Sequence, residues 1–113
     1  MSDVEQKREH FRISYPIGHS GKILIRKAEY PIIDVSQRGI RFSINGKSVE
    51  DEWDVELPIK AQVSFLFGEK VEVSGKVLRT SEVNVILYLD EGIPLKHMYD
   101  EHRYLIKNFS IDD

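Results

Sequence analysis

The sequence predicts an all-β domain in which six antiparallel strands close into a barrel, followed by a C-terminal α-helix. Two observations support this fold class. Six short segments alternate between apolar and polar residues and are separated by turn residues, as expected of strands with one buried face. The final segment instead repeats apolar residues every three or four positions, which is typical of a helix. A closed barrel is favoured over an open sheet because it leaves no unpaired strand edges.

The chain of 113 residues has room for one domain with a modest core. Residues 1–18 are expected to form a flexible polar arm, because proline and glycine in the stretch Tyr15-Pro-Ile-Gly18 oppose regular structure. Residues 19–113 are expected to form the barrel and its helix. The six predicted strands lie at 22–26, 31–36, 39–44, 61–67, 71–80 and 83–89.

The second and third predicted strands are separated by a short turn, so they should pair as a hairpin. Alternation in the second strand places Ile33 and Val35 in the core and leaves Asp34 and Ser36 outside. The third strand repeats the pattern and exposes Arg41. The hairpin therefore predicts a polar outer face beside a buried apolar one.

Two connections in the second half of the chain have informative residues. Residues 45–60 are predicted to be an acidic loop whose Trp53 covers one end of the barrel, and docking of a partner on this aromatic residue is the alternative. Gly68-Glu69 is predicted to be the two-residue type II′ turn of a hairpin between the fourth and fifth strands.

The predicted helix has one apolar stripe, and Pro94 is acceptable at a first helical position. An isolated helix of this length would be marginally stable, so the stripe is expected to seal one end of the barrel. Contact with a partner's groove or with a second copy of the chain is the alternative. The stripe comprises Leu95, Met98, His102, Leu105 and Phe109.

Composition limits the location and the ligand of the protein. There is no cysteine, no apolar run long enough to span a membrane and no signal-peptide core, so a soluble cytoplasmic protein is expected. The formal net charge is −3, but residues 1–41 hold eight Lys/Arg against five Asp/Glu, whereas the remainder holds eight against fourteen. This basic N-terminal part suits a small anionic ligand better than a nucleic-acid strand, which the acidic remainder would repel.

Two short motifs predict a site for a guanine-bearing phosphate ligand. Arg8 and Arg12 are four residues apart, so their side chains project in the same direction whether the segment is extended or helical. Two guanidinium groups can then bind a phosphate or the O6/N7 edge of guanine through paired donors. Asp34 and Ser36 share one face of a strand, where a carboxylate can accept from guanine N1–H and N2–H. Gly39 supplies either a positive φ or a close backbone approach.

This pair of motifs, RxxxR followed by (D/N)xSxxG, resembles that of the PilZ domain, a bacterial receptor domain for cyclic di-GMP. The resemblance covers nearly the whole chain, because a six-stranded barrel with a terminal helix is also typical of that family. It implies that Arg8 and Arg12 bind phosphates and contact the guanines, that Asp34 and Ser36 recognise one guanine, and that Gly39 shapes the turn beneath it. Cyclic di-GMP would be the ligand, and no cofactor or metal is expected.

The resemblance also implies auxiliary contacts. Lys7 matches a position where many PilZ domains carry a basic residue and where a second, stacked ligand can be held. Arg38 and Arg79 are further candidates, although strict alternation places Arg79 on the face of Val77 unless a bulge at Gly75 changes its direction. The arm is expected to become ordered over the ligand, and the changed surface would signal to an unidentified downstream protein.

The sequence is also compatible with other functions. A PilZ-like adaptor that binds proteins but no nucleotide is the main alternative, and a small barrel that binds a nucleic-acid strand is a weaker one. Catalysis is not expected, because Ser36 lacks the surroundings of a nucleophile elbow and the chain has no phosphate-binding P-loop. His97, Asp100 and Glu101 lie within one helical turn, but this spacing alone does not predict a metal site.

Overall fold

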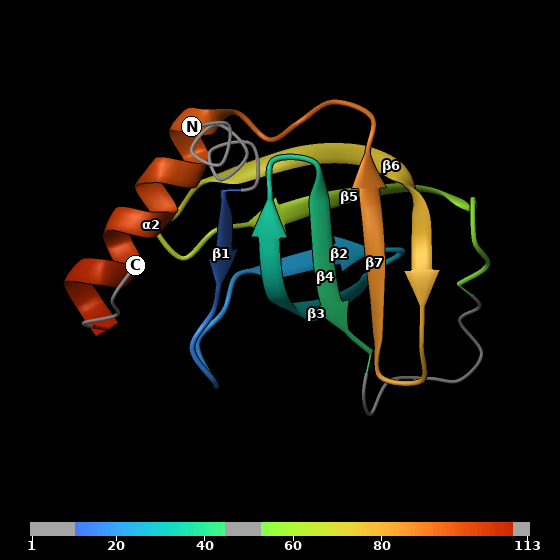
Figure 1. Ribbon diagram of the computed structural model, residues 1–113, viewed down its shortest axis with the longest axis horizontal. Helices are drawn as coiled ribbons and strands as arrows, with labels where there is room; N and C mark the ends of the chain where they lie inside the picture. The colour runs from blue at the N-terminus through green and yellow to red at the C-terminus, as the bar shows by residue number, and fades with distance from the viewer. Residues whose placement is uncertain (1–10, 45–52, 110–113) are drawn as a thin grey trace, which may run out of the picture.

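The computed structural model of the chain describes residues 11–44 and 53–109. These residues contain seven β-strands and one α-helix (Figure 1). The elements are β1 (Arg12–Ser14), β2 (Lys22–Ile25), β3 (Ala28–Ser36), β4 (Gly39–Ser43), β5 (Pro58–Ser64), β6 (Lys70–Thr80), β7 (Asn84–Leu89) and α2 (Leu95–Phe109).

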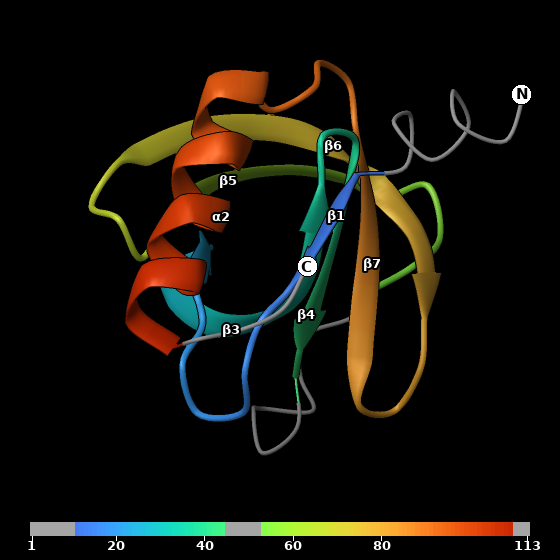
Figure 2. The same ribbon diagram turned by 60° about the vertical axis from the view of Figure 1, so that its left-hand side comes forward.

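The six longer strands form a closed antiparallel barrel. Their order is β3-β2-β5-β6-β7-β4, and the pairing of β4 with β3 closes the ring. The helix α2 lies at one end of the barrel (Figures 1 and 2). The predicted six-stranded barrel with a terminal helix is therefore confirmed, as is the hairpin of β3 and β4.

The strand β1 was not expected, because residues 12–14 belong to the predicted arm. It pairs with β3, with Arg12 opposite Ser36 and Ser14 opposite Asp34. Its central residue Ile13 is only 2% exposed and belongs to the core. The burial of this side chain, together with the free hydrogen-bonding groups of β3, explains why the segment is a strand. Residues 1–10 of the predicted arm lie outside the described residues.

Trp53 is buried in the core, whereas residues 45–52 of the predicted acidic loop lie outside the described residues. Trp53 is 7% exposed, and its ring packs against those of Tyr30 and Phe42 at centroid distances of 5.7 and 5.4 Å. The guanidinium of Arg26 lies over the same ring, at 5.5 Å from its centroid. A side chain enclosed in this way is unavailable as the anchor of a partner-docking loop.

Two β-bulges change which residues face the core. The first lies in β3 between Ile32 and Asp34, where the register with β4 shifts. Because one extra residue is inserted, Ile32 and Val35 are both buried and Ile33 is only half-buried, contrary to the predicted alternation. Asp34 still lies on the polar outer face. The second bulge lies in β6 and bears directly on the candidate site.

Gly75 lies where the pairing of β6 with β5 ends and its pairing with β7 begins, and it allows the strand to bend there. It pairs with Ile59 of β5 on one side and with Leu89 of β7 on the other. A Cβ atom at this position would lie 2.1 Å from the backbone oxygen of Tyr88, which no real structure tolerates. The bulge that the sequence analysis considered at Gly75 does not lie there; the glycine instead permits close approach of the β7 backbone.

The helix is anchored by a buried carboxylate. Glu101 is fully buried in the described structure, within the stripe that also buries Met98 and Leu105. Its oxygens accept hydrogen bonds from the backbone amides of Leu66 (2.9 Å) and Phe67 (3.0 Å). Leu95, which the sequence placed in the stripe, is instead 41% exposed.

The same carboxylate binds the segment that follows β1. The hydroxyl of Tyr15 donates to Glu101 Oε2 over 2.5 Å. Three donors on two distant segments therefore compensate for the removal of this charge from water. The helix, the β5–β6 connection and the end of β1 are joined at one point.

The β5–β6 connection differs from the predicted two-residue turn. It spans five residues, 65–69, and the amide of Phe65 donates to the carbonyl of Glu69 over 2.9 Å. Gly68 adopts a φ of 117°, which accounts for glycine at that position. The longer loop directs the amides of Leu66 and Phe67 at Glu101, an arrangement that a tight turn would not provide.

We expect Tyr15→Phe to lower the free energy of unfolding at pH 7 by about 1.5–3 kcal/mol, because it removes a hydrogen bond to a buried charge. Burial, and then the charge of Glu101, raise the pKa of Tyr15 above its ordinary value of 10.0. The stabilisation from the neutral phenol is complete below that pH and decreases as the pH rises above it. Urea unfolding at pH 7 and at about pH 11 would measure both effects.

The matched control is Tyr99→Phe, because Tyr99 is 50% exposed on α2, the helix that carries Glu101. Its stability should stay close to that of the unmodified chain at both pH values. The Tyr15→Phe chain should lose less stability between the two pH values than the unmodified chain does. Equal losses in all three chains would contradict the assigned role of Tyr15.

Candidate functional site

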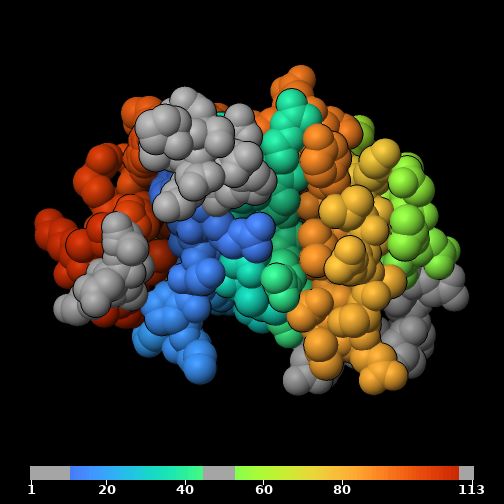
Figure 3. Space-filling model, viewed as in Figure 1, coloured from blue at the N-terminus to red at the C-terminus, as the bar shows by residue number. Residues whose placement is uncertain are grey.

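A hollow on the outer surface of the barrel collects most of the predicted site residues. It has a volume of about 270 Å³ and extends across β1, β3, β4, β7 and β6. These strands face the viewer in Figures 1 and 3. Its lining residues are Arg12, Asp34, Ser36, Gly39, Ile40, Arg41, Leu78, Arg79 and Ile86.

One row of cross-strand neighbours runs through this hollow. Asp34 of β3 lies opposite Arg41 of β4, and Arg41 lies opposite Ile86 of β7. Ile86 in turn lies opposite Arg79 of β6. Strand neighbours of this kind have Cβ atoms about 5 Å apart, so the row brings one carboxylate and two guanidinium groups together around an aliphatic side chain.

The next row places Arg12 of the first sequence motif beside the second motif. Arg12 of β1 lies opposite Ser36 of β3. Ser36 Oγ accepts a hydrogen bond from the amide of Gly39 over 3.1 Å and so closes the turn between β3 and β4. A Cβ atom at Gly39 would lie 3.3 Å from that oxygen, and the φ of Gly39 is not positive. The positive φ that was one predicted reason for this glycine is therefore absent, and a close approach of its backbone to a ligand stays a prediction.

Asp34 is paired with two arginines. Its Oδ1 lies 3.9 Å from Arg12 Nη1, and its Oδ2 lies 3.3 Å from Arg41 Nε. The carboxylate side chain is 15% exposed, whereas those of Arg12 and Arg41 are 50% and 38% exposed. Attraction is stronger near a partly buried group than in open solvent, so Asp34 gathers both guanidinium groups at the hollow.

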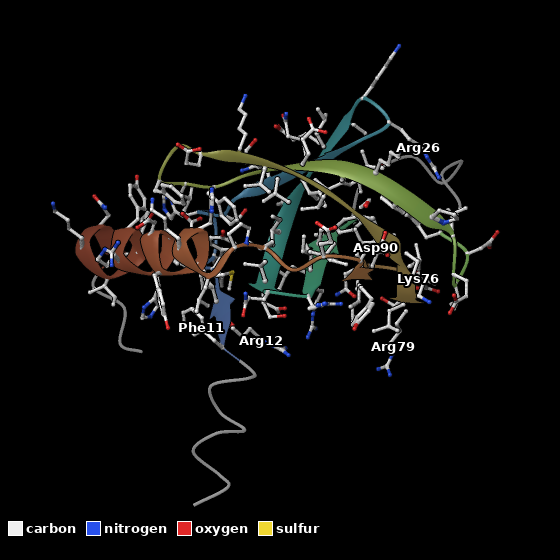
Figure 4. All side chains as sticks on the ribbon, turned by 90° about the horizontal axis from the view of Figure 1, so that it is seen from above. Phe11, Arg12, Arg26, Lys76, Arg79 and Asp90 are labelled. Carbon is white, nitrogen blue, oxygen red and sulfur yellow. The ribbon has the colours of Figure 1, made fainter. Side chains whose placement is uncertain are left out.

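Arg79 reaches the hollow because of the second bulge. The register of β6 with β7 shifts between Val77 and Arg79, so Leu78 is the extra residue. Val77 is fully buried, whereas Leu78 and Arg79 are both exposed. A bulge does redirect Arg79 as the sequence required, but it lies three residues after Gly75. In Figure 4 the labelled Arg12 and Arg79 project from the same side of the barrel.

Arg38 is directed elsewhere. Its guanidinium lies over the ring of Tyr88, at 5.9 Å from the centroid, and its Nη1 lies 3.5 Å from both the Tyr88 hydroxyl and the carbonyl of Leu89. It is not among the residues that line the hollow. Lys7 and Arg8 lie outside the described residues, so their predicted contacts stay predictions.

Comparison with known proteins identifies the family. The model of the PilZ domain matches residues 6–109, which is nearly the whole chain. The chain belongs to the PilZ domain family. PilZ domains are generally non-catalytic receptors that typically bind cyclic di-GMP. No curated protein matches the chain.

The fold of this PilZ domain is also similar to a solved structure. An uncharacterized protein of Legionella aligns with a TM-score of 0.57 and 19% sequence identity. The alignment covers 83% of this chain and 99% of that protein. At this level of identity the likeness concerns the fold alone.

Arg41 is a lining residue of the PilZ domain that sequence reasoning left out of the site. The alternation of apolar and polar residues correctly predicted that the side chain of Arg41 is exposed on β4. The hairpin prediction also implied that it would lie near Asp34 on the neighbouring strand. Combining the two would have identified it, because a charged side chain on the same face as a motif carboxylate is a natural partner for it.

Other hollows in the described residues lack this excess of arginines. One of about 610 Å³ is lined by Glu72, Asp90 and Glu91 with Lys60 as its one basic residue, so it does not suit an anion. A second hollow, of about 680 Å³, lies against α2, but its Asp100 and Arg103 are paired with each other. In residues 11–44 and 53–109, no three His, Cys, Asp or Glu residues lie close enough to hold a metal ion. No helix in these ranges is sufficiently long and apolar to cross a membrane.

Replacing Ser36 should destabilise the turn beneath the hollow. Ser36→Ala removes the acceptor of the Gly39 amide, so we expect the free energy of unfolding to fall by about 0.5–1.5 kcal/mol. Urea denaturation would measure this change. Ser14→Ala is a suitable control, because Ser14 is exposed on β1 and no hydrogen bond of its side chain to other described residues is found. A loss no larger than that of the control would contradict the prediction.

Proposed function

We propose that this PilZ domain is a receptor for cyclic di-GMP that binds the dinucleotide in the hollow on the β1–β3–β4 face. One observation carries the proposal: residues of both sequence motifs lie beside one another there, with Arg12 opposite Ser36 and paired with Asp34. Separately, each motif is common in charged chains. Their convergence on one hollow is what a ligand site requires.

The chemistry of the lining supports an anionic, guanine-bearing ligand. The three guanidinium groups of Arg12, Arg41 and Arg79 outnumber the one carboxylate of Asp34, which leaves a formal charge of +2 at the hollow. Cyclic di-GMP carries two phosphodiester charges of the opposite sign. Arginine binds phosphate oxygens through paired donors, and Asp34 offers the acceptor that guanine N1–H and N2–H need.

The size of the hollow supports a ligand held partly at the surface. Its volume of about 270 Å³ is just below the range of about 300–1,000 Å³ for small-molecule sites. A dinucleotide would therefore need further contacts above the hollow. We propose that Lys7 and Arg8, which precede β1 in the sequence, supply them.

We further propose that binding changes the surface of the protein and that a downstream protein responds to this change. The segment that carries Arg12 also contacts the helix. The ring of Phe11 lies 5.5 Å from those of Tyr99 and His102, and Tyr15 donates to Glu101. A ligand that holds β1 in place would also stabilise its contacts with α2, because residues on both sides of Arg12 pack on that helix.

Calorimetric titration tests the ligand. We expect cyclic di-GMP to bind with a Kd in the micromolar range or below, equivalent to about −8 kcal/mol, and GTP and cyclic di-AMP to bind much more weakly. Arg12→Ala and Asp34→Ala should each weaken binding by about 1.5–3 kcal/mol, the usual scale of a hydrogen bond to a charged group. Circular dichroism should stay unchanged, because both side chains lie outside the apolar core.

The matched control is Arg103→Ala, since Arg103 is an exposed arginine that pairs with Asp100 on α2. It should bind cyclic di-GMP as the unmodified chain does. Absence of heat from a folded chain would favour a ligand-blind adaptor. Retention on single-stranded DNA at moderate salt would favour a nucleic-acid-binding barrel instead.

Amide hydrogen exchange tests the conformational output. Saturating cyclic di-GMP should slow exchange at residues 11–15 and 98–102 more than at β5, because the ligand holds β1 and β1 contacts α2. β5 is the internal reference, since it contributes nothing to the lining of the hollow. Uniform slowing over all three regions would contradict a specific effect on the helix.

A further inference from the structure

Arg41 occupies a distinctive place in the hollow. It lies on β4, which is paired with β3 on one side and with β7 on the other. Arg12, by contrast, lies at the start of a three-residue strand that pairs with β3 alone. The backbone of Arg41 is therefore fixed by two neighbouring strands, and that of Arg12 by one.

The contact between Arg41 and Asp34 is close but incomplete. Arg41 Nε lies 3.3 Å from Asp34 Oδ2, yet this nitrogen is buried and has no hydrogen-bond partner of acceptable geometry among the described residues. A buried donor without a partner costs free energy, so a small rotation that completes the bond would be favourable. Arg41 thus attracts one oxygen of Asp34 electrostatically. A small rotation would add a hydrogen bond between the two side chains.

The two oxygens of Asp34 therefore face different arginines. Oδ2 faces the fixed Arg41, and Oδ1 faces Arg12 at the longer distance of 3.9 Å. If Arg12 turns to a ligand phosphate, Oδ1 loses its neighbour while Oδ2 keeps its own. The carboxylate then presents a free oxygen in a constrained orientation, which is what recognition of a guanine edge requires.

We propose that Arg41 is a positioning residue that orients the Asp34 carboxylate and thereby sets the preference of the site for guanine over adenine. This inference rests on the proposed binding of cyclic di-GMP. Adenine carries no N1–H and no amino group at C2. An oriented Asp34 carboxylate would therefore accept these hydrogen bonds from guanine only. A carboxylate that rotates freely would discriminate less, because it would have to be ordered when the ligand binds.

A double-mutant cycle tests this role. Cyclic di-GMP and cyclic di-AMP would be titrated into the unmodified chain, Arg41→Ala, Asp34→Ala and the double variant. We expect Arg41→Ala to weaken binding of cyclic di-GMP about tenfold and to reduce the preference over cyclic di-AMP. In the Asp34→Ala background, the same change should alter the affinity for cyclic di-GMP by less than about threefold, because no carboxylate remains to be oriented.

Arg41→Lys provides a second, milder variant and keeps a positive charge opposite Asp34. It should recover part of the guanine preference lost in Arg41→Ala, and thermal unfolding would show that each variant is folded. Losses that multiply in the double variant would mean that Arg41 contacts the ligand itself, which would overturn the inference. An Arg41→Ala chain with unchanged affinity and preference would also overturn it.

The outcomes also separate this inference from the proposed function. A chain that binds cyclic di-GMP but shows independent effects of Arg41 and Asp34 retains the proposed function and rejects the positioning role. An unmodified chain that binds no cyclic di-GMP rejects both. Arg103→Ala, which changes an arginine paired with Asp100 on α2, should leave the affinity and the preference unaltered and controls for loss of a positive charge.

Discussion

The arrangement of the site depends on the pairing of β3 with three other strands. Along its first half β3 pairs with β2, and along its second half it pairs with both β1 and β4. This double pairing holds the stretch with Asp34 and Ser36 between Arg12 on one strand and Arg41 on the other. The bulge at Ile33 keeps Val35 in the core while Asp34 faces outward. Strand pairing thus brings the two motifs together.

Two carboxylates in this protein illustrate different uses of the same group. Glu101 is fully buried, and its donors are two backbone amides and one phenol. Such an acid is fully occupied and serves the fold, because any loss of a donor leaves a charge uncompensated. Asp34 is partly exposed, and its partners are two arginine side chains that are 50% and 38% exposed. It can exchange one partner for a ligand at little cost.

The sequence predicted the barrel, the helix and the outward face of the motif residues, because these follow from periodicity and local turn chemistry. It could not place the bulges at Ile33 and Leu78, since two consecutive apolar residues do not show which of them is the extra one. Nor could it assign Glu101, whose donors lie on segments far away in the chain. The exposure of Arg41 was predicted correctly, and its place opposite Asp34 follows from the register of the short hairpin, because the bulge lies beyond that pair.

The close contact at Gly75 has a consequence for experiments that rank positions by their effect on ligand binding. Any side chain there would meet the β7 backbone and force β6 and β7 apart. The pairing of β6 with β7 places Arg79 opposite Ile86 at the edge of the hollow. In a mutational scan selected for affinity, Gly75 would therefore score as strongly as a contact residue. Only a parallel measurement of folded protein would distinguish a damaged barrel from a lost ligand contact.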